Sequence, residues 1–113
     1  MRVWQEAIVL VEDVYRLTSS FPREEIYGLT SQMRRAAVSV PANIAEGSAR
    51  NGTRELLHFL SISSASLAEL DTHVEIACRL NFLTHPADLK GRMDTVSALL
   101  LALSASLRRK QVE

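Results

Sequence analysis

The sequence has few aromatic residues, few turn-forming residues and a single cysteine. Aromatic side chains make up 5% of its 113 residues, although hydrophobic residues as a group make up 47%. Its 4 glycines and 3 prolines are few for a β-sandwich or barrel, which needs many turns. Alanine, leucine, serine and valine dominate instead. This composition predicts an all-α protein with one domain, residues 1–113, and a modest core.

An excess of positive charge is also missing. The 13 basic and 13 acidic side chains cancel, whereas a protein that coats nucleic acid without sequence preference is usually strongly basic. A role on nucleic acid would therefore need a local basic patch, multiplied by symmetry. Cys78, the single cysteine, excludes an intramolecular disulfide and suits a reducing cytosol.

Long uninterrupted apolar runs do not occur. No stretch approaches the roughly 18 uncharged apolar residues of a membrane span. Gln5, Glu6, Glu12 and Asp13 interrupt the first apolar segment, so it lacks the core of a signal peptide. We therefore expect a cytoplasmic protein without a membrane partner.

The stretch from Leu29 to Gly47, LTSQMRRAAVSVPANIAEG, holds the most unusual residue choices. Pro41 lacks a backbone donor, and its ring crowds the carbonyl of Ala37. One interpretation is that the helix ends there. We favour a second helix that is kinked at Pro41 and continues, because helical spacing holds on both sides of the proline. The positions that recur at steps of three and four are Leu29, Met33, Ala36, Val40, Asn43 and Gly47.

Asn43 places an amide on this otherwise apolar stripe, facing a core or an interface. A buried amide without partners costs about 1–3 kcal/mol. The carbonyl of Ala37 and other groups freed at the kink are candidate partners. Gly47 is a natural place for the helix to stop, since glycine adopts the left-handed conformation of a helix end.

Three further segments have helical periodicity. They are residues 2–18, residues 54–82 and residues 86–109, and the second helix begins anywhere from Pro22 to Leu29. Thr53 and Thr84 are candidate caps for the last two helices. The run SISSAS, residues 61–66, lets helix backbones approach closely. Four helices with short connections predict an antiparallel up-down four-helix bundle.

The first segment carries two neighbouring apolar stripes, which is more than one bundle seam requires. The second stripe consists of Trp4, Ile8, Val11 and Tyr15. Either this helix lies deep between its neighbours, or its second face meets another subunit. Trp4 is a candidate anchor for such an interface, or it closes one end of the monomer core.

The search for reactive groups gives no catalytic constellation. Two-iron bundles need a pair of Glu-x-x-His motifs, and Glu55 and His58 form only one. Glu69 and His73 are four residues apart and suit a simple pair. Cys78 has no evident base, and P-loop, dinucleotide and zinc motifs are lacking. We expect no catalytic residue, no metal and no cofactor.

Two arginine clusters remain as candidate nucleic-acid-binding residues. Arg34 and Arg35 lie in the second helix, and Arg50 and Arg54 flank the turn after it. Such clusters are more often solvated, paired faces than phosphate sites. In a symmetric ring, however, each arginine recurs once per subunit, so a neutral subunit still presents concentrated positive charge.

The segment from Gly28 to Arg50, GLTSQMRRAAVSVPANIAEGSAR, strongly resembles the family of 23S rRNA intervening-sequence proteins. The resemblance continues in ELLHFLSISSASLAELDTHVEIACRL, residues 55–80, and in the start, VWQEAIVLVEDVYRLTSSFPREE. The arginine pair and the NIAEG signature, residues 43–47, are its most specific features.

The resemblance implies a four-helix-bundle subunit and a ring-shaped homopentamer, as known for relatives. The chain is also similar to accessory variability proteins of diversity-generating retroelements, which form pentameric barrels and associate with a reverse transcriptase and RNA through basic surfaces. Arg34, Arg35, Arg50 and Arg54 fit that function. The residues assigned to the interface or to the structural signature are Trp4, Pro41, Asn43, Glu46 and Gly47.

Three hypotheses follow from the sequence. The first is a non-catalytic homo-oligomer, of five copies, that associates with RNA or with a nucleic-acid-processing protein. The second is a protein-interaction scaffold that binds no nucleic acid, which the neutral charge favours. The third is a metalloprotein that uses Glu55 and His58.

Overall fold

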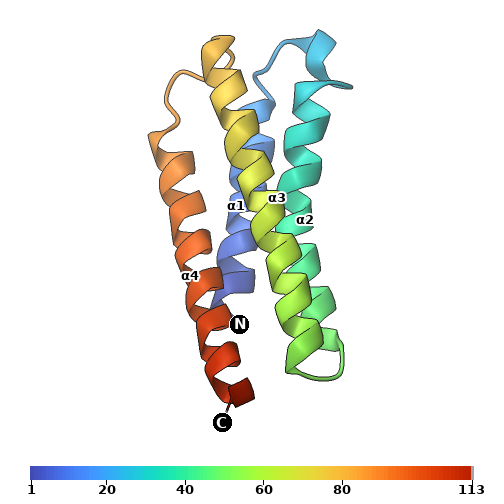
Figure 1. Cartoon of the computed structure of the whole chain (residues 1–113). Coiled ribbons are helices and arrows are strands. Elements are labelled where there is room, and N and C mark those ends of the chain that lie inside the picture. The colour runs from blue at the N-terminus through green and yellow to red at the C-terminus, as the bar shows by residue number, and fades with distance from the viewer. Residues whose placement is uncertain (113) are drawn as a thin grey trace.

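The structure, a computed structural model, describes residues 1–112 and is built from helices alone over that range (Figure 1). The four α-helices are α1 (Arg2–Thr18), α2 (Leu29–Ala49), α3 (Thr53–Arg79) and α4 (Ala87–Val112), with a short 3-10 helix, η1 (Arg23–Glu25), before α2. The all-α four-helix prediction is confirmed.

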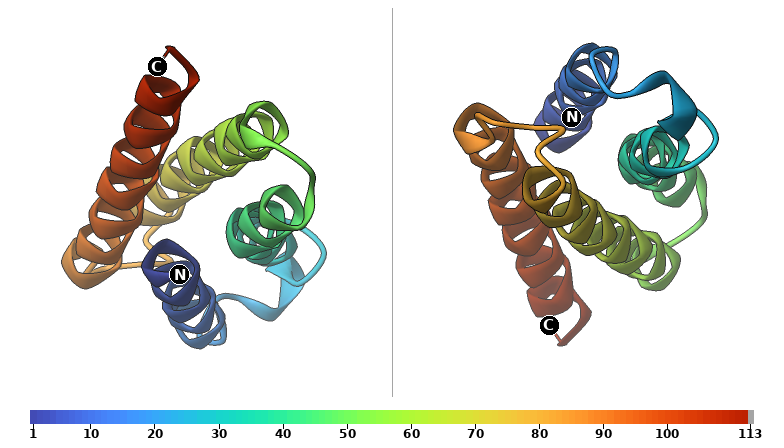
Figure 2. Two further views of the ribbon diagram at one scale, coloured as in Figure 1. Left: turned by 90° about the horizontal axis from the view of Figure 1, so that it is seen from below. Right: turned by 90° about the horizontal axis from the view of Figure 1, so that it is seen from above.

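The helices pack in the cyclic order α1, α2, α3, α4. Each helix contacts its two neighbours in this order, and α4 closes the arrangement by packing on α1. In the view along the bundle axis in Figure 2, α1 and α2 form one side of the bundle and α3 and α4 form the opposite side. Short connections at alternate ends make consecutive helices run in opposite directions (Figure 1).

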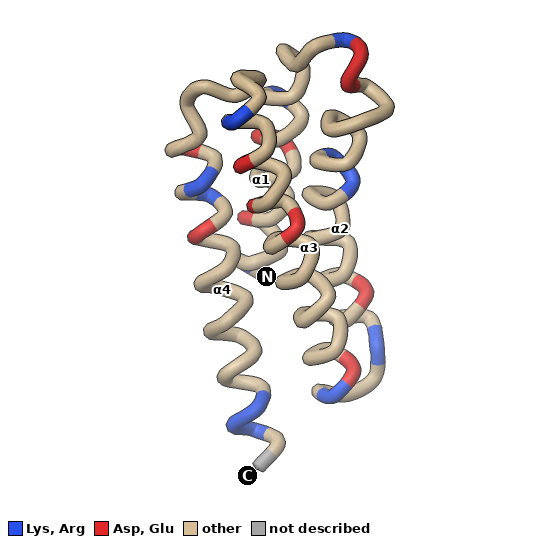
Figure 3. Tube along the Cα trace, turned by 45° about the horizontal axis from the view of Figure 1, so that its top comes forward, with Lys and Arg blue, Asp and Glu red and all other residues tan. Residues whose placement is uncertain are grey.

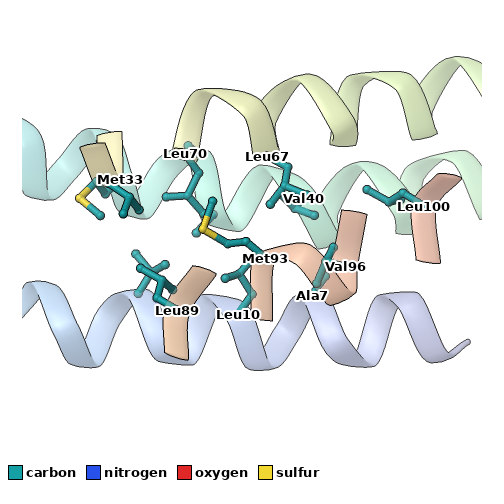
Figure 4. Packing of buried hydrophobic residues seen from close by; sticks show 14 of the residues in the cluster. Ala7, Leu10, Met33, Val40, Leu67, Leu70, Leu89, Met93, Val96 and Leu100 are labelled. Atoms are coloured by element: carbon teal, nitrogen blue, oxygen red, sulfur yellow. The ribbon is translucent and has the colours of Figure 1, made fainter. Parts of the chain in front are cut away.

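One apolar core fills the space between the four helices. The first of the two apolar stripes of α1 is buried at Val3, Ala7, Leu10 and Val14, because residues three and four apart lie on one side of a helix. Figure 4 shows side chains from all four helices interleaving in this core, among them Met33, Val40, Leu70, Met93 and Val96.

Small residues bring α2 and α3 close together. The hydroxyl of Ser63, which is fully buried, donates to the carbonyl of Val40 at 2.8 Å. The hydroxyls of Ser39 and Ser66 lie 2.8 Å apart. The close approach predicted from the SISSAS run is therefore confirmed, and these two contacts fix the register between α2 and α3.

Pro41 does not end its helix. It lies inside α2 and is buried, and the helix continues to Ala49, so the interpretation that the helix stops at the proline is wrong. The bend itself stays a prediction. Gly47 does not end the helix either, since α2 continues to Ala49 and Arg50 follows it with an extended backbone conformation.

Two predicted caps are wrong. Gly52, with φ of 99°, precedes α3, and Thr53 is the first residue of the helix. Only glycine adopts such a φ readily, so the chain reverses at Gly52 before the threonine. The hydroxyl of Thr84 lies 2.9 Å from Nδ1 of His85 and not on the backbone of α4.

The boundaries of α2 and α3 are set by local groups. The Leu29 backbone N–H donates to the Glu25 carboxylate at 3.1 Å, which satisfies a free donor at the start of α2. At the C-terminal end of α3, Asn81 has φ of 63° and stops the helix after Arg79, earlier than predicted.

None of the helices in the described part of the chain has both the length and the apolar character needed to cross a membrane.

Candidate nucleic-acid and subunit interfaces

Arg34 is held against α1 by three contacts. Its Nε donates to the Thr18 hydroxyl at 2.9 Å, and its guanidinium carbon lies 4.6 Å from the centroid of the Tyr15 ring. A second guanidinium nitrogen, Nη2, reaches the Tyr15 carbonyl at 3.5 Å. Since Thr18 is itself buried, this arginine fastens α2 to α1. The structure thus gives Arg34 a packing role that the sequence did not predict.

Arg35 points away from Arg34, because consecutive residues on an α-helix are about 100° apart. It lines a polar groove between α2 and α3 together with Ser39, Ser66 and Glu69. Its side chain is exposed, and within residues 1–112 it forms no ion pair. Arg35 is therefore free to meet an external anion.

In the second arginine cluster, too, one arginine is engaged within the subunit and the other is not. Arg50 donates to Glu46 at 3.0 Å, lies 3.9 Å from a carboxylate oxygen of Glu55, and stacks 5.1 Å from the centroid of the Phe59 ring. Arg54 is exposed and has no ion-pair partner in the described part of the chain. Each cluster thus contributes one engaged arginine and one available arginine.

The four arginines do not form one patch on the subunit. Arg35 lies in α2 and Arg50 directly follows the end of this helix, fifteen residues later, which corresponds to about 22 Å at 1.5 Å per residue. Figure 3 shows one acidic segment between the basic segment of α2 and the basic segments around the turn to α3. A concentrated cationic surface therefore requires several copies of the chain.

The NIAEG signature serves the contact between α2 and α3. A Cβ added at Gly47 would lie 2.8 Å from Cβ of Phe59 and 3.1 Å from a methyl group of Leu56, so only glycine fits there. Asn43 donates to the carbonyl and the hydroxyl of Ser39 at 2.8 and 2.9 Å. The predicted partner of this amide, the carbonyl of Ala37, is therefore not the one it uses, because Ser39 lies one turn before it on the same side.

The second stripe of α1 is left partly uncovered. Trp4 and Tyr15 are 41% and 44% exposed, and Ile8 and Val11 between them are half-buried. Trp4 lines an open apolar hollow against the last turns of α2, with Ile44 and Ala45. It therefore does not close the monomer core completely, and its role at an interface stays a prediction.

Potential metal ligands are scattered. Glu55 and His58 are both exposed, and the described residues contain no group of three or more ligating side chains that could hold a metal ion. His73 pairs with Glu69 at 3.5 Å as predicted, but it is 5% exposed, and its Nδ1 has no hydrogen-bond partner in the described chain. Its spacing from Leu70 and Ala77 was the signal for burial that the prediction missed.

Ion pairs on α1, α3 and α4 account for further charges. Arg92 of α4 contacts Asp13 at 3.3 Å and Glu6 at 3.4 Å, which joins α4 to α1. The hydrogen bond from Arg79 lowers the pKa of the Glu75 carboxyl. These pairs lie on surfaces other than the second stripe of α1.

Comparison with known proteins identifies a family. Residues 1–102 match the family model described as 23S rRNA-intervening sequence protein. The match covers α1, α2 and α3 and extends into α4, which the resemblance noted from the sequence did not. A search of the curated proteins returned no match to this sequence.

Proposed function

We propose, from the premise that the chain belongs to the 23S rRNA-intervening sequence protein family, that it is a non-catalytic accessory protein that works as a homo-oligomer of five copies. In this role it associates with RNA, or with a protein that processes nucleic acid, in the cytoplasm. The observation that carries the assembly is the uncovered stripe of α1 with Trp4 at one end and Tyr15 at the other.

Two exposed arginines support the association with RNA. Arg35 and Arg54 form no ion pair among residues 1–112, so their guanidinium groups are available to phosphate oxygens. A ring repeats each of them once per subunit, which concentrates positive charge although the subunit is neutral. Arg34 and Arg50 position the scaffold and contribute to RNA binding only indirectly.

Charge reversal at the two available arginines tests this function. In the double variant Arg35→Glu/Arg54→Glu, we expect affinity for a fluorescein-labelled single-stranded RNA to fall by at least about tenfold, with a shallower dependence on salt concentration. Fluorescence anisotropy measures the affinity, and circular dichroism should show unchanged helicity.

The matched control carries the same change in net charge elsewhere. Arg23→Glu/Arg79→Glu alters two exposed arginines on η1 and at the end of α3. We expect it to retain nearly the original affinity. An equal loss in both double variants would mean that only net charge matters, and no loss in either would contradict the RNA function.

A protein-interaction scaffold without nucleic acid is the second candidate. The observation in its favour is that Arg34 and Arg50 are already engaged within the subunit, which leaves little cationic surface. This candidate predicts that a protein partner captured by the tagged oligomer stays bound after nuclease treatment. Loss of the partner with the nucleic acid would favour the RNA function.

A further inference from the structure

Two surfaces with little charge lie on opposite sides of the bundle. The first, called here the α1–α2 face, contains bulky side chains at the outer seam of these helices. Val38 of α2 is 42% exposed, comparable to Trp4 and Tyr15 of α1. Between Glu6 and Glu12, and between Arg35 and Glu46, neither helix carries a charged residue. The α1–α2 face consists of Trp4, Ile8, Val11, Tyr15, Arg34, Val38 and Ala45.

The second surface, called here the α3–α4 face, is built mostly from small side chains. A groove runs between the two helices, with the buried side chains of Leu67 and Met93 at its base. Ser64, Ala68 and Ser97 line its sides. Leu101, one turn beyond Ser97 on α4, is 65% exposed. A groove with small walls is a shape that receives bulky side chains from a partner.

Opposite charges lie on the two faces at the same height along the bundle axis, a positive one on the α1–α2 face and negative ones on the α3–α4 face. Asp71 and Asp94 line the same groove, are exposed, and form no ion pair in the described part of the chain. On α2, Arg34 lies five residues before Ser39, and on the antiparallel α3, Asp71 lies five residues after Ser66. Since Ser39 contacts Ser66, Arg34 and Asp71 lie at the same height.

We propose that the α1–α2 face of one copy packs on the α3–α4 face of the next copy. This inference rests on the proposed homo-oligomeric function and names the surfaces that build the oligomer. A head-to-tail contact joins two different faces of each subunit, and it gives a closed ring where the rotation between copies closes. Figure 2 shows that α1 and α2 lie on one side of the bundle and α3 and α4 on the other. Rotation about an axis parallel to the helices keeps heights unchanged, so Arg34 meets Asp71 and Asp94 while the uncharged parts meet each other.

Blocking each face separately tests the proposal. The first variant, Trp4→Glu/Val38→Glu, places carboxylates on the α1–α2 face, and the second, Ala68→Glu/Leu101→Glu, places them on the α3–α4 face. All four positions are exposed, so circular dichroism should show folded bundles. By light scattering after size exclusion, we expect each variant alone to have the 12.6 kDa mass of one chain.

Mixing the two variants distinguishes head-to-tail contact from other geometries. Each variant keeps one intact face, so an equimolar mixture should form a complex of two chains and nothing larger. A symmetric contact of one face with itself would give no such rescue and would overturn the proposal. Tyr27→Glu/Leu80→Glu serves as control, because both side chains are exposed and lie outside the two faces.

The original chain separates failure of this inference from failure of the proposed function. A monomeric original chain would contradict both the homo-oligomer and the interface. An oligomeric original chain with both blocked variants still oligomeric would overturn the assignment of the faces and leave the homo-oligomer standing. Asp71→Arg/Asp94→Arg should raise the dissociation constant by at least about tenfold, because it places like charges opposite Arg34.

Discussion

At the residue scale, the signature residues act through neighbours that are distant in sequence. Gly47 is adjacent to Phe59 and Leu56 across the contact between α2 and α3, and its missing side chain sets how closely the two helices approach. Asn43 bonds to Ser39, which in turn contacts Ser66 of α3. Gly47 and Asn43 therefore both act at the contact between α2 and α3.

Substitution by alanine should change the stability of the bundle in opposite directions at two helical glycines. Gly47→Ala should destabilise the bundle by about 1–2 kcal/mol, because overpacking against the Cβ of Phe59 outweighs the better helix propensity of alanine. Gly91 of α4 has no atom within 4 Å of an added Cβ. Gly91→Ala should therefore stabilise it by about 0.5–1 kcal/mol.

Thermal and urea unfolding of both glycine variants provide the measurement. Because the two substitutions are chemically identical, the difference between them isolates the contact with α3. Equal effects of the same sign would show that α2 and α3 can move apart at Gly47 without cost.

At the element scale, the four helices differ in how completely they are covered. The buried contacts of Ser63 with Val40 and the fit at Gly47 make α2 and α3 the tightest pair. In α4, Leu100 is buried, but Leu103 and Leu107 are only half-buried, and the helix extends past the start of α1 (Figure 1). The last turns of α4 have fewer neighbours within the subunit.

Hydrogen exchange should reproduce this order. We expect the slowest amides near Val40 in α2 and Ser63 in α3, and faster exchange in α4 from Leu103 onward, because local opening there exposes little buried surface. Hydrogen exchange measured by mass spectrometry on the monomeric variants Trp4→Glu/Val38→Glu and Ala68→Glu/Leu101→Glu gives the exchange rates of the subunit without contacts between copies. Slow exchange to the end of α4 in those variants would contradict the prediction.

At the scale of the whole molecule, the 13 basic and 13 acidic side chains cancel in number, but only some of them are paired with one another. Arg50 and Arg92 are paired within the subunit, while Arg35 and Arg54 remain available. The two faces proposed for assembly carry few charges, so the interactions that hold copies together differ in kind from those that would hold RNA. Salt concentration should separate the two.

A salt series checks that separation. Raising sodium chloride should leave the oligomer mass nearly unchanged, because burial of apolar area is not screened and an exposed ion pair contributes only about 0–1 kcal/mol. RNA affinity should fall linearly with salt on logarithmic axes. Light scattering and fluorescence anisotropy on the same samples measure both, and dissociation of subunits together with RNA release would show instead that RNA holds the oligomer together.

The sequence by itself determined the helices and the core. Steps of three and four place one side chain of each turn on the same side, so most of the buried positions of α1 and α3 could be predicted without a structure. The buried Thr18 at the end of α1 was not among them. The same periodicity indicated the second apolar stripe of α1. Boundaries were less predictable, because Gly52 and Asn81 decide them through local backbone conformation.

Only the tertiary structure decided which polar residues are available. Arg34 and Arg35 are adjacent and chemically identical, yet one is fixed on Tyr15 and Thr18 and the other faces an open groove. The helical turn between them points each toward a different neighbour, and the identity of that neighbour depends on packing between distant segments. For the same reason, Gly47 and His73 could be interpreted fully only once α2 and α3 were in contact.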